Sequence, residues 1–135
     1  MSEHILVVDD EKEIADLIEI YLVSDGYKVF KAENAARGLE ILAKEDIHLV
    51  LLDIMMPEMR GDELCVAIKS DIETSHIPVL LLTALGEENN ILDGLSIGAD
   101  EYLIKPFSVK ILRANIANLL ANRELLRMRY ANLDI

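Results

Sequence analysis

Short runs of apolar residues alternate with amphipathic stretches along the whole chain, and this alternation limits the fold more than any other feature. The runs at 5–8, 48–52 and 79–82 are unbroken, and 27–32 and 102–104 also predict strands. Unbroken apolar strands separated by helices are typical of a parallel sheet covered on both faces. Because crossovers between parallel strands are right-handed, the sequence predicts a doubly wound α/β fold. It is a (βα)5 unit with a five-stranded sheet and three layers.

Capping residues and glycines set the predicted helix boundaries. Asn34 and Ser108 are suited to cap helices, and Gly26 and Gly98 to end them. Gly94 lies inside a predicted helix and lowers its stability. The predicted helices cover about 11–24, 35–44, 62–70, 87–97 and 109–129.

The charge of the chain is negative and unevenly distributed. The 135 residues carry a net charge of −12, and residues 1–104 hold 7 Lys/Arg against 23 Asp/Glu. Such an acidic body repels phosphate backbones, which argues against direct nucleic-acid binding, but it suits a divalent cation. The single cysteine, Cys65, excludes an internal disulfide and fits the reducing cytoplasm. We find no signal-peptide pattern, and the apolar runs are too short to span a bilayer.

Polar residues stand where the predicted strands end. Asp9 and Asp10 follow the first strand, Asp53 the third, Thr83 the fourth and Lys105 the fifth. Each alone has an ordinary explanation, such as helix capping, strand packing or a solvated surface. Together they meet at one edge of a parallel sheet, where sites of such folds lie. Three carboxylates converging there repel one another unless a cation or protons intervene, and Mg²⁺ suits such a site because it prefers oxygen ligands.

The order and spacing of these residues match a known family. The chain resembles the receiver domain of two-component response regulators over about residues 4–121. The motifs that carry the resemblance are Ile5-Leu-Val-Val-Asp-Asp-Glu11, Leu52-Asp-Ile-Met-Met-Pro-Glu-Met-Arg-Gly61, Leu82-Thr-Ala84, Gly98-Ala-Asp-Glu-Tyr102 and Lys105-Pro-Phe107. The family has the flavodoxin-like strand order 2-1-3-4-5, which we expect here.

The resemblance implies a role for each site residue. Asp53 would accept a phosphoryl group from a kinase phosphohistidine, and Lys105 would pair with a phosphoryl oxygen. Asp10 would bind Mg²⁺ directly and Asp9 mainly through water, with the backbone carbonyl of Met55 as a further ligand. The domain would thus be a phosphorylation-dependent switch that supports its own Mg²⁺-dependent phosphorylation and dephosphorylation, not an enzyme in the usual sense.

The resemblance also implies a switch pair. Thr83 would donate its hydroxyl to the phosphoryl group, beside the small Ala84. Tyr102 would turn inward as Thr83 moves towards the phosphoryl group. The alternative is that Tyr102 is an ordinary, half-buried tyrosine of a strand. The family commonly has a cis bond at the position of Lys105-Pro106, which an X–Pro bond permits.

A narrower likeness concerns the partners. Residues 65, 68–71, 74–78 and 118–123 resemble receivers attached to hybrid sensor kinases of Bacteroidetes-type bacteria. That likeness implies a histidine kinase, within the same polypeptide or separate, a downstream helix-turn-helix module in transcription regulation, and a cytoplasmic phosphorelay. A phosphorylation-linked homodimer is a further expectation. We divide the chain into a receiver at 1–121 and a helical extension or linker at 122–135.

Other functions fit the sequence less well. A dehalogenase-type phosphatase needs a second Asp where Met55 stands, and no P-loop is present. A flavodoxin-like carrier would meet repulsion between Asp9-Asp10 and a cofactor phosphate. An interaction module of the same fold that works without phosphorylation is the remaining alternative.

Several residues outside these motifs have ordinary expected roles. Cys65 is expected in the core, and the three histidines look too scattered for a metal site. Arg60 departs from the family pattern and is read as loop variation or as a local effect on partner recognition. Apolar Met55 and Leu85 predict slow loss of the phosphoryl group.

Along the last helix we expect packing on the sheet by Ile111, Leu112, Ile116, Leu119 and Leu120. Beyond Asn122, Arg123, Arg127 and Arg129 are expected in a linker to an output module, in a dimer contact with an acidic face, or in a fraying tail.

Overall fold

A parallel five-stranded sheet forms the centre of the computed structural model, which describes residues 2–84 and 98–133. The strand order is β2-β1-β3-β4-β5, and all neighbouring strands are parallel. This confirms the predicted doubly wound topology. The strands are β1 (His4–Val8), β2 (Lys28–Ala32), β3 (Leu49–Asp53), β4 (Val79–Ala84) and β5 (Glu101–Lys105).

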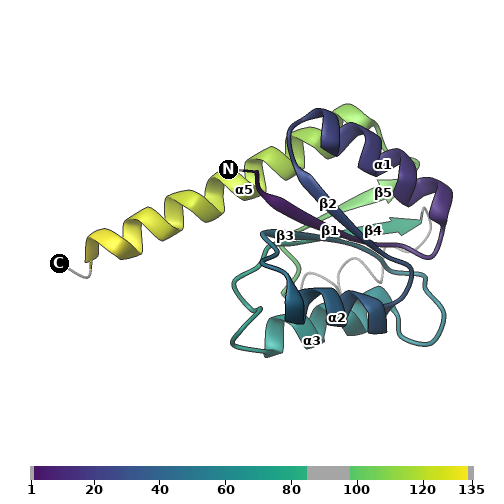
Figure 1. The fold of residues 1–135 in the computed structure, drawn as a ribbon, viewed down its shortest axis with the longest axis horizontal. Coiled ribbons are helices and arrows are strands. Elements are labelled where there is room, and N and C mark those ends of the chain that lie inside the picture. The colour runs from purple at the N-terminus through teal and green to yellow at the C-terminus, as the bar shows by residue number, and fades with distance from the viewer. Residues whose placement is uncertain (1, 85–97, 134–135) are drawn as a thin grey trace.

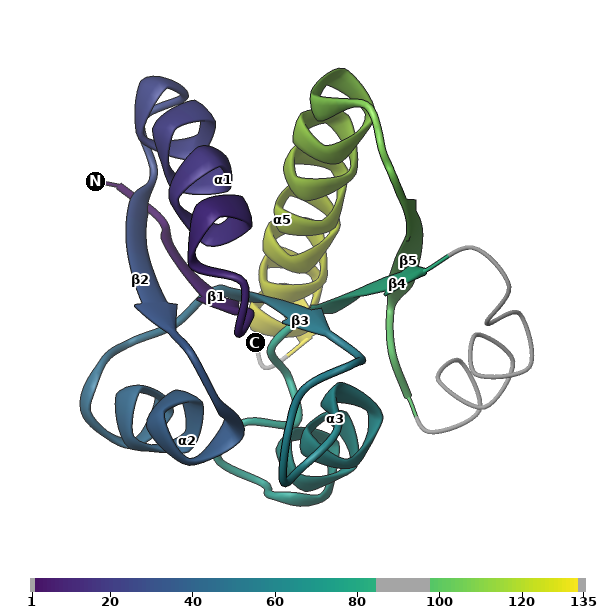
Figure 2. The same ribbon diagram turned by 90° about the vertical axis from the view of Figure 1, so that its right-hand side faces the viewer.

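Helices cover both faces of the sheet and complete three layers (Figure 1). Figure 2 shows α1 and α5 on one face, with α2 and α3 on the other. The predicted helix over 87–97 lies outside the described residues. The described helices are α1 (Lys12–Ser24), α2 (Ala35–Lys44), α3 (Gly61–Ser70) and α5 (Val109–Leu133).

Each face of the sheet carries its own apolar core. In β1, Leu6 and Val8 join the core that includes residues of α2 and α3, whereas Ile5 and Val7 join the core with α1 and α5. All five residues of β3 are buried. Burying such an aliphatic side chain stabilises the fold by about 1.5–3 kcal/mol, so the central strands hold their ends in fixed positions.

The predicted capping residues lie where the sequence placed them. The Asn34 side chain accepts a hydrogen bond from the Arg37 backbone N–H at 2.8 Å. The Ser108 hydroxyl accepts one from the Lys110 N–H at 3.2 Å, at the start of α5. Gly26 follows α1 with a φ of +94°, a conformation that favours glycine.

The last helix differs from its prediction in two ways. It runs to Leu133 and not to about residue 129. Ile111 does not pack on the sheet, because 53% of it is exposed. The buried residues Leu112, Ile116 and Leu120 are four positions apart, so they form one narrow stripe. Ile111 is about 100° away from Leu112 around the helix and lies outside that stripe.

Gly61 lets the start of α3 approach the end of β3 closely. A Cβ atom at this position would lie 2.1 Å from the carbonyl oxygen of Asp53 and 2.9 Å from the Cα atom of Ile54. The Gly61 N–H donates to the Ile54 carbonyl at 2.9 Å. Only a glycine allows this approach, which fixes the backbone that carries Asp53.

Candidate functional site

Asp9, Asp53 and Lys105 meet at the carboxyl edge of the sheet. Asp9 and Asp53 are only 2% and 4% exposed. The ammonium of Lys105 lies 3.5 Å from Oδ2 of Asp9 and 3.4 Å from Oδ1 of Asp53. These residues come from the ends of β1, β3 and β5, so the structure brings together the side chains that the strand-end argument selected.

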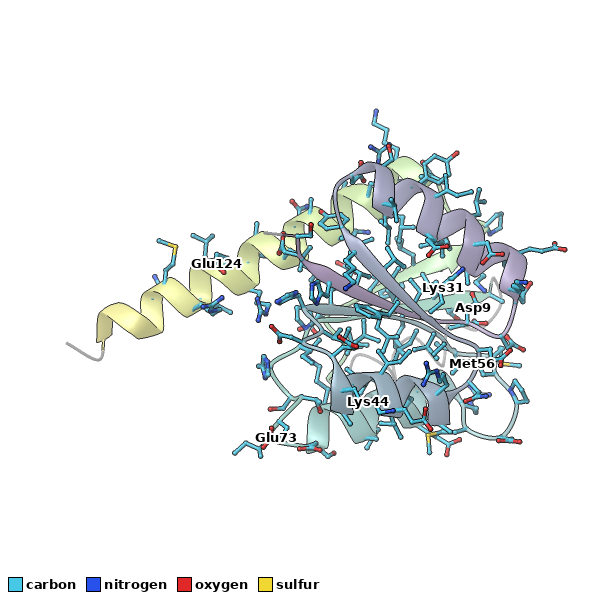
Figure 3. The ribbon with its side chains drawn as sticks, viewed as in Figure 1. Asp9, Lys31, Lys44, Met56, Glu73 and Glu124 are labelled. Atoms are coloured by element: carbon cyan, nitrogen blue, oxygen red, sulfur yellow. The ribbon has the colours of Figure 1, made fainter. Side chains whose placement is uncertain are left out.

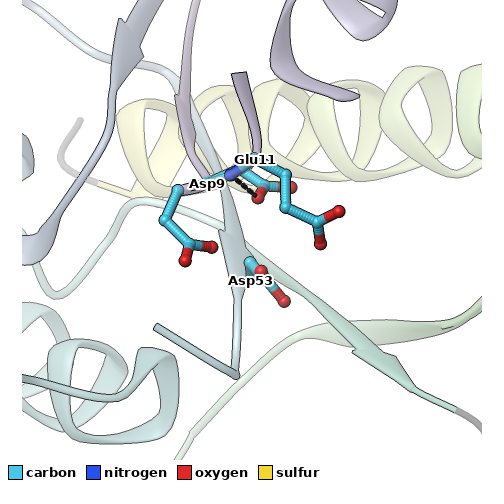
Figure 4. A group of neighbouring side chains, drawn as sticks. Asp9, Glu11 and Asp53 are labelled. Carbon is cyan, nitrogen blue, oxygen red and sulfur yellow. Dashed lines mark hydrogen bonds between the residues drawn. The ribbon is translucent and has the colours of Figure 1, made fainter. Parts of the chain in front are cut away.

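Two further carboxylates, those of Asp10 and Glu11, lie beside Asp9 and Asp53. One oxygen from each of Asp9, Asp10, Glu11 and Asp53 lies within 4.8 Å of the others. Glu11 was not assigned to the site from the sequence, although it directly follows the Asp9-Asp10 pair. Its backbone N–H donates to Oδ1 of Asp9 at 2.9 Å (Figure 4). Its carboxylate lies 3.5 Å from the Lys105 ammonium. The first loop therefore supplies three of the four carboxylates.

Burial and mutual repulsion favour the protonated form of the buried carboxyls. Burial raises the pKa of Asp53 to about 7, and the nearby charge of Asp9 adds to this, while Lys105 opposes both. Burial also raises the pKa of Asp9, against the hydrogen bond from Glu11 and the charge of Lys105. Burial lowers the pKa of Lys105, but Asp53, Asp9 and Glu11 outweigh it and raise this pKa overall. One lysine thus leaves the cluster short of positive charge.

Thr83 and Tyr102 share a face of the sheet beside this cluster. Thr83 pairs with Ile104 in the register, and Tyr102 pairs with Leu81. Because side chains alternate along a strand, Thr83 and Tyr102 point to the same face. Thr83 is buried, and its hydroxyl has no hydrogen-bond partner in the part of the chain that the structure describes. Tyr102 is half-buried and packs against the core on that face.

The loop after β3 borders the site. Met56 is buried in the core, whereas about half of Met55 is exposed. Nε of Arg60 lies 3.1 Å from Oδ1 of Asp62, and Nη1 of Arg60 donates to the Met55 sulfur at 3.6 Å. The opposite border includes exposed Ala84 and the Lys105-Pro106 bond, which is cis. Leu85 lies outside the described residues.

Two of the histidines are not scattered. The rings of His4 and His48 lie 5.2 Å apart, and the His4 N–H donates to Nδ1 of His48 at 2.8 Å. They meet because β1 and β3 are neighbours, in a register that pairs Ile5 with Leu49. The pair serves the fold at the start of the strands, at the end of the sheet away from Asp53. Cys65 is fully buried in α3, as expected.

The donor set at the carboxyl edge suits one type of ligand. Four carboxylates offer only oxygen atoms, and hard cations such as Mg²⁺ take oxygen ligands. A cation beside Asp53 would offset the repulsion that raises its pKa. The Lys105 ammonium remains as a donor for an anion next to that cation, as does the Thr83 hydroxyl, which has no partner among the described residues.

The family profile described as the response regulator receiver domain matches residues 5–117. This chain belongs to the response regulator receiver domain family. The receiver domain is the phosphorylation-controlled switch of two-component signalling, a regulatory module and not a classical enzyme. The resemblance to this family, and the switch function that the resemblance implies, are thereby confirmed.

Known proteins extend this match. The receiver domain is 44% identical over 128 residues to Histidine kinase P4 of Formosa agariphila, covering 95% of this chain and 9% of that protein. It is 41% identical over 116 residues to the phosphate regulon transcriptional regulatory protein PhoB of Pseudomonas aeruginosa, covering 86% and 51%. The chain therefore spans about half or less of the length of these curated relatives. The match to a histidine kinase agrees with the likeness to receivers attached to sensor kinases.

Solved structures share the fold of the described residues. A CheY-like response regulator receiver domain protein from Methanospirillum hungatei superposes with a TM-score of 0.86 at 31% identity, covering 92% of this chain and 98% of that chain. A response regulator receiver domain protein from Clostridium thermocellum superposes with a TM-score of 0.85 at 34% identity, with the same coverage of both chains.

Within the receiver domain, the described helices lack the length and apolar character of a membrane span.

Proposed function

We propose that Asp53 is the phosphoacceptor of this receiver domain. One observation carries the proposal: a buried carboxylate at the end of the central strand lies 3.4 Å from the Lys105 ammonium, within a cluster of acidic residues. In the step, an Asp53 carboxylate oxygen attacks the phosphorus of a phosphohistidine. An O–P bond forms as the P–N bond breaks, and the electron pair returns to the imidazole nitrogen, which takes up a proton.

The acidic cluster would hold Mg²⁺. Asp10 is proposed as a direct ligand, Asp9 as a ligand mainly through water, and Asp53 and the Met55 carbonyl as the remaining protein ligands. When bound, the ion neutralises charge on the transferring phosphoryl group and aligns it. Support comes from the all-oxygen donor set and from the raised pKa values of the two buried carboxyls.

Lys105 and Thr83 would hold the phosphoryl oxygens of the product. Lys105 already faces Asp53 and acts as a point charge. The buried Thr83 hydroxyl would gain its hydrogen-bond acceptor only after phosphorylation. That new interaction favours one of two packings of Thr83 and Tyr102 and so shifts their populations. Their common face of the sheet supports this coupling.

The apolar Met55 side chain would slow the loss of the phosphoryl group. It follows Asp53 by two residues, and the Arg60 guanidinium contacts its sulfur. An apolar residue at this position neither orients nor activates an attacking water.

We propose a cytoplasmic histidine kinase as the phosphoryl donor, within the same polypeptide or separate, and a helix-turn-helix module downstream as output. In this division residues 1–121 form the receiver, and residues 122–135 form a C-terminal extension or linker. The continuous course of α5 through Leu133 supports the linker.

Mass spectrometry of the intact chain tests the proposal. The chain is incubated with acetyl phosphate, with and without Mg²⁺, alongside Asp53→Asn. We expect one phosphoryl adduct that requires Mg²⁺ and is absent from the variant. An adduct of equal yield in Asp53→Asn would refute the assignment. No adduct, together with failure to bind beryllofluoride, would indicate an interaction module that works without phosphorylation.

A further inference from the structure

A groove lies between the ends of α2 and α3, at the edge of the sheet where the strands begin. Its volume is about 380 Å³. Figure 3 shows Glu73, which lines the groove, at the opposite end of the sheet from Asp9 of the phosphorylation site. We call it the α2–α3 groove, and its apolar lining consists of Leu39, Leu42, Ala43, Ile47, Ala67 and Ile77.

Large apolar side chains are exposed to water at this groove. Leu39 is 39% exposed in the lining itself, and Ile72, in the turn after α3, is 88% exposed. Ile72 stands between Asp71 and Glu73, which both line the groove. Exposed apolar surface that is rimmed by polar residues is typical of an interaction site, because a partner can bury it.

The charge of the α2–α3 groove is negative. No Lys or Arg of the described residues lines it. Within the same part of the chain, Glu45 and Glu73 form no ion pair, and the nearby Lys69 is already bound to Asp100 at 2.9 Å. The carboxylates in the lining are those of Glu45, Asp46, Asp71 and Glu73.

Two of these carboxylates lie at the unfavourable ends of helices. Glu45 directly follows the last residue of α2, and Asp71 directly follows the last residue of α3. The carboxyl-terminal end of a helix carries partial negative charge, so cations stabilise it and carboxylates do not. Departures from such local rules are expected at functional sites. A cation supplied by a partner would offset the repulsion at both helix ends.

We propose that the α2–α3 groove binds a protein segment in which large apolar side chains are flanked by lysine or arginine. The apolar side chains would pack against Leu39 and Ile72, and the cations would meet Glu45 and Glu73. Charge complementarity carries this choice of occupant, since the same carboxylates repel nucleic acids and acidic proteins. The groove shares no lining residue with the Asp53 site. Its failure to bind would therefore leave the proposed function intact.

Nuclear magnetic resonance titration of the full, isotope-labelled chain tests the proposal. The probe is a short synthetic peptide of leucine and lysine, with a leucine at every third or fourth position. We expect chemical-shift changes at 39–47 and 67–77. The double variant Glu45→Lys/Glu73→Lys should weaken binding at least tenfold, whereas the matched control Glu13→Lys/Glu33→Lys should change it little. Both control residues are exposed, and neither lines the groove.

Two further comparisons separate the groove from general attraction to an acidic chain. Leu39→Asn should weaken binding, whereas Ile20→Asn, at a 64% exposed residue of α1, should not. Equal loss from the groove and control variants, or no binding at millimolar peptide, would overturn the proposal. Equal binding of a peptide with glutamine in place of lysine would overturn the choice of a cationic occupant. Self-association of the chain that Leu39→Asn abolishes would also overturn it, in favour of a second copy.

The stability of the free chain gives an independent test. Glu45→Lys should raise the urea midpoint, because a cation replaces a carboxylate at the end of α2. Glu13→Lys should lower it, because Glu13 lies in the first turn of α1, where a carboxylate is favourable. A lower midpoint for Glu45→Lys would show that this carboxylate serves the fold, and would overturn the argument for a partner.

Discussion

Replacing Gly61 by alanine tests how the fold places Asp53. The new Cβ atom would lie 2.1 Å from the Asp53 carbonyl oxygen and 2.8 Å from its carbonyl carbon. These are backbone atoms of a buried strand, so no flexible side chain can move aside. Either the start of α3 or the end of β3 must shift by about 1 Å to restore ordinary contact distances.

The expected loss of stability is near the upper end of the range for overpacking, about 3 kcal/mol. Gly38→Ala is the matched control, because it places the same methyl group in α2. There the nearest atom is Cγ2 of the Val8 side chain at 3.2 Å. The gain in helix propensity, about 1 kcal/mol, offsets that mild crowding. We therefore expect Gly38→Ala to change the free energy of unfolding by less than about 1 kcal/mol.

Urea unfolding followed by circular dichroism measures both variants. With a slope of about 1–3 kcal/mol per molar urea, Gly61→Ala should lower the midpoint by about 1–3 M. A phosphorylation assay with acetyl phosphate should also show slower adduct formation, because the Asp53 backbone has moved. If Gly61→Ala were as stable as Gly38→Ala, the close approach of α3 to β3 would not be needed and the reasoning would fail.

Three further predictions concern the site itself. Folding raises the pKa of Asp53 from 3.8 to about 7. Between these pH values the folded state therefore binds more protons than the unfolded state. Without metal ions, the free energy of unfolding should fall as the pH rises from 4 to 7. Asp53→Asn should flatten this dependence in urea titrations, and an unchanged slope would contradict the assigned pKa. Lys105→Met should slow adduct formation by on the order of 100-fold, while Lys110→Met, on the exposed start of α5, should not; equal rates would exclude the role of Lys105. Met55→Asn should shorten the lifetime of the phosphorylated chain several-fold, as followed by intact mass after removal of the donor, and an unchanged lifetime would refute the role of Met55.

Most of the fold was predictable because strong local signals agreed with the tertiary structure. The unbroken apolar runs became the buried central strands, and their parallel order brought Asp9, Asp53 and Lys105 to one edge. The amide capped by Asn34 and the turn at Gly26 depend on local chemistry alone, so the sequence was sufficient for both.

The remaining features depend on three-dimensional placement that no local pattern reveals. Glu11 joins the acidic cluster because the loop after β1 turns its carboxylate back towards Lys105. His4 and His48 meet only through the pairing of β1 with β3. Ile111 is exposed because of the orientation of α5 about its own axis on the sheet. The spacing of apolar residues did not decide whether Ile111 or only Leu112 faces the sheet. In each case the tertiary contact, and not the residue type, decides the outcome.

Locating the phosphoryl group on the chain tests the central claim most directly. After incubation with acetyl phosphate and Mg²⁺, borohydride converts a phosphorylated aspartate into homoserine, and peptide sequencing by mass spectrometry finds the altered position. We expect homoserine at Asp53 alone, and only when Mg²⁺ is present. Homoserine at Asp9 or Asp10, or an unaltered Asp53 in a chain that carries the adduct, would contradict the assignment of Asp53 as phosphoacceptor.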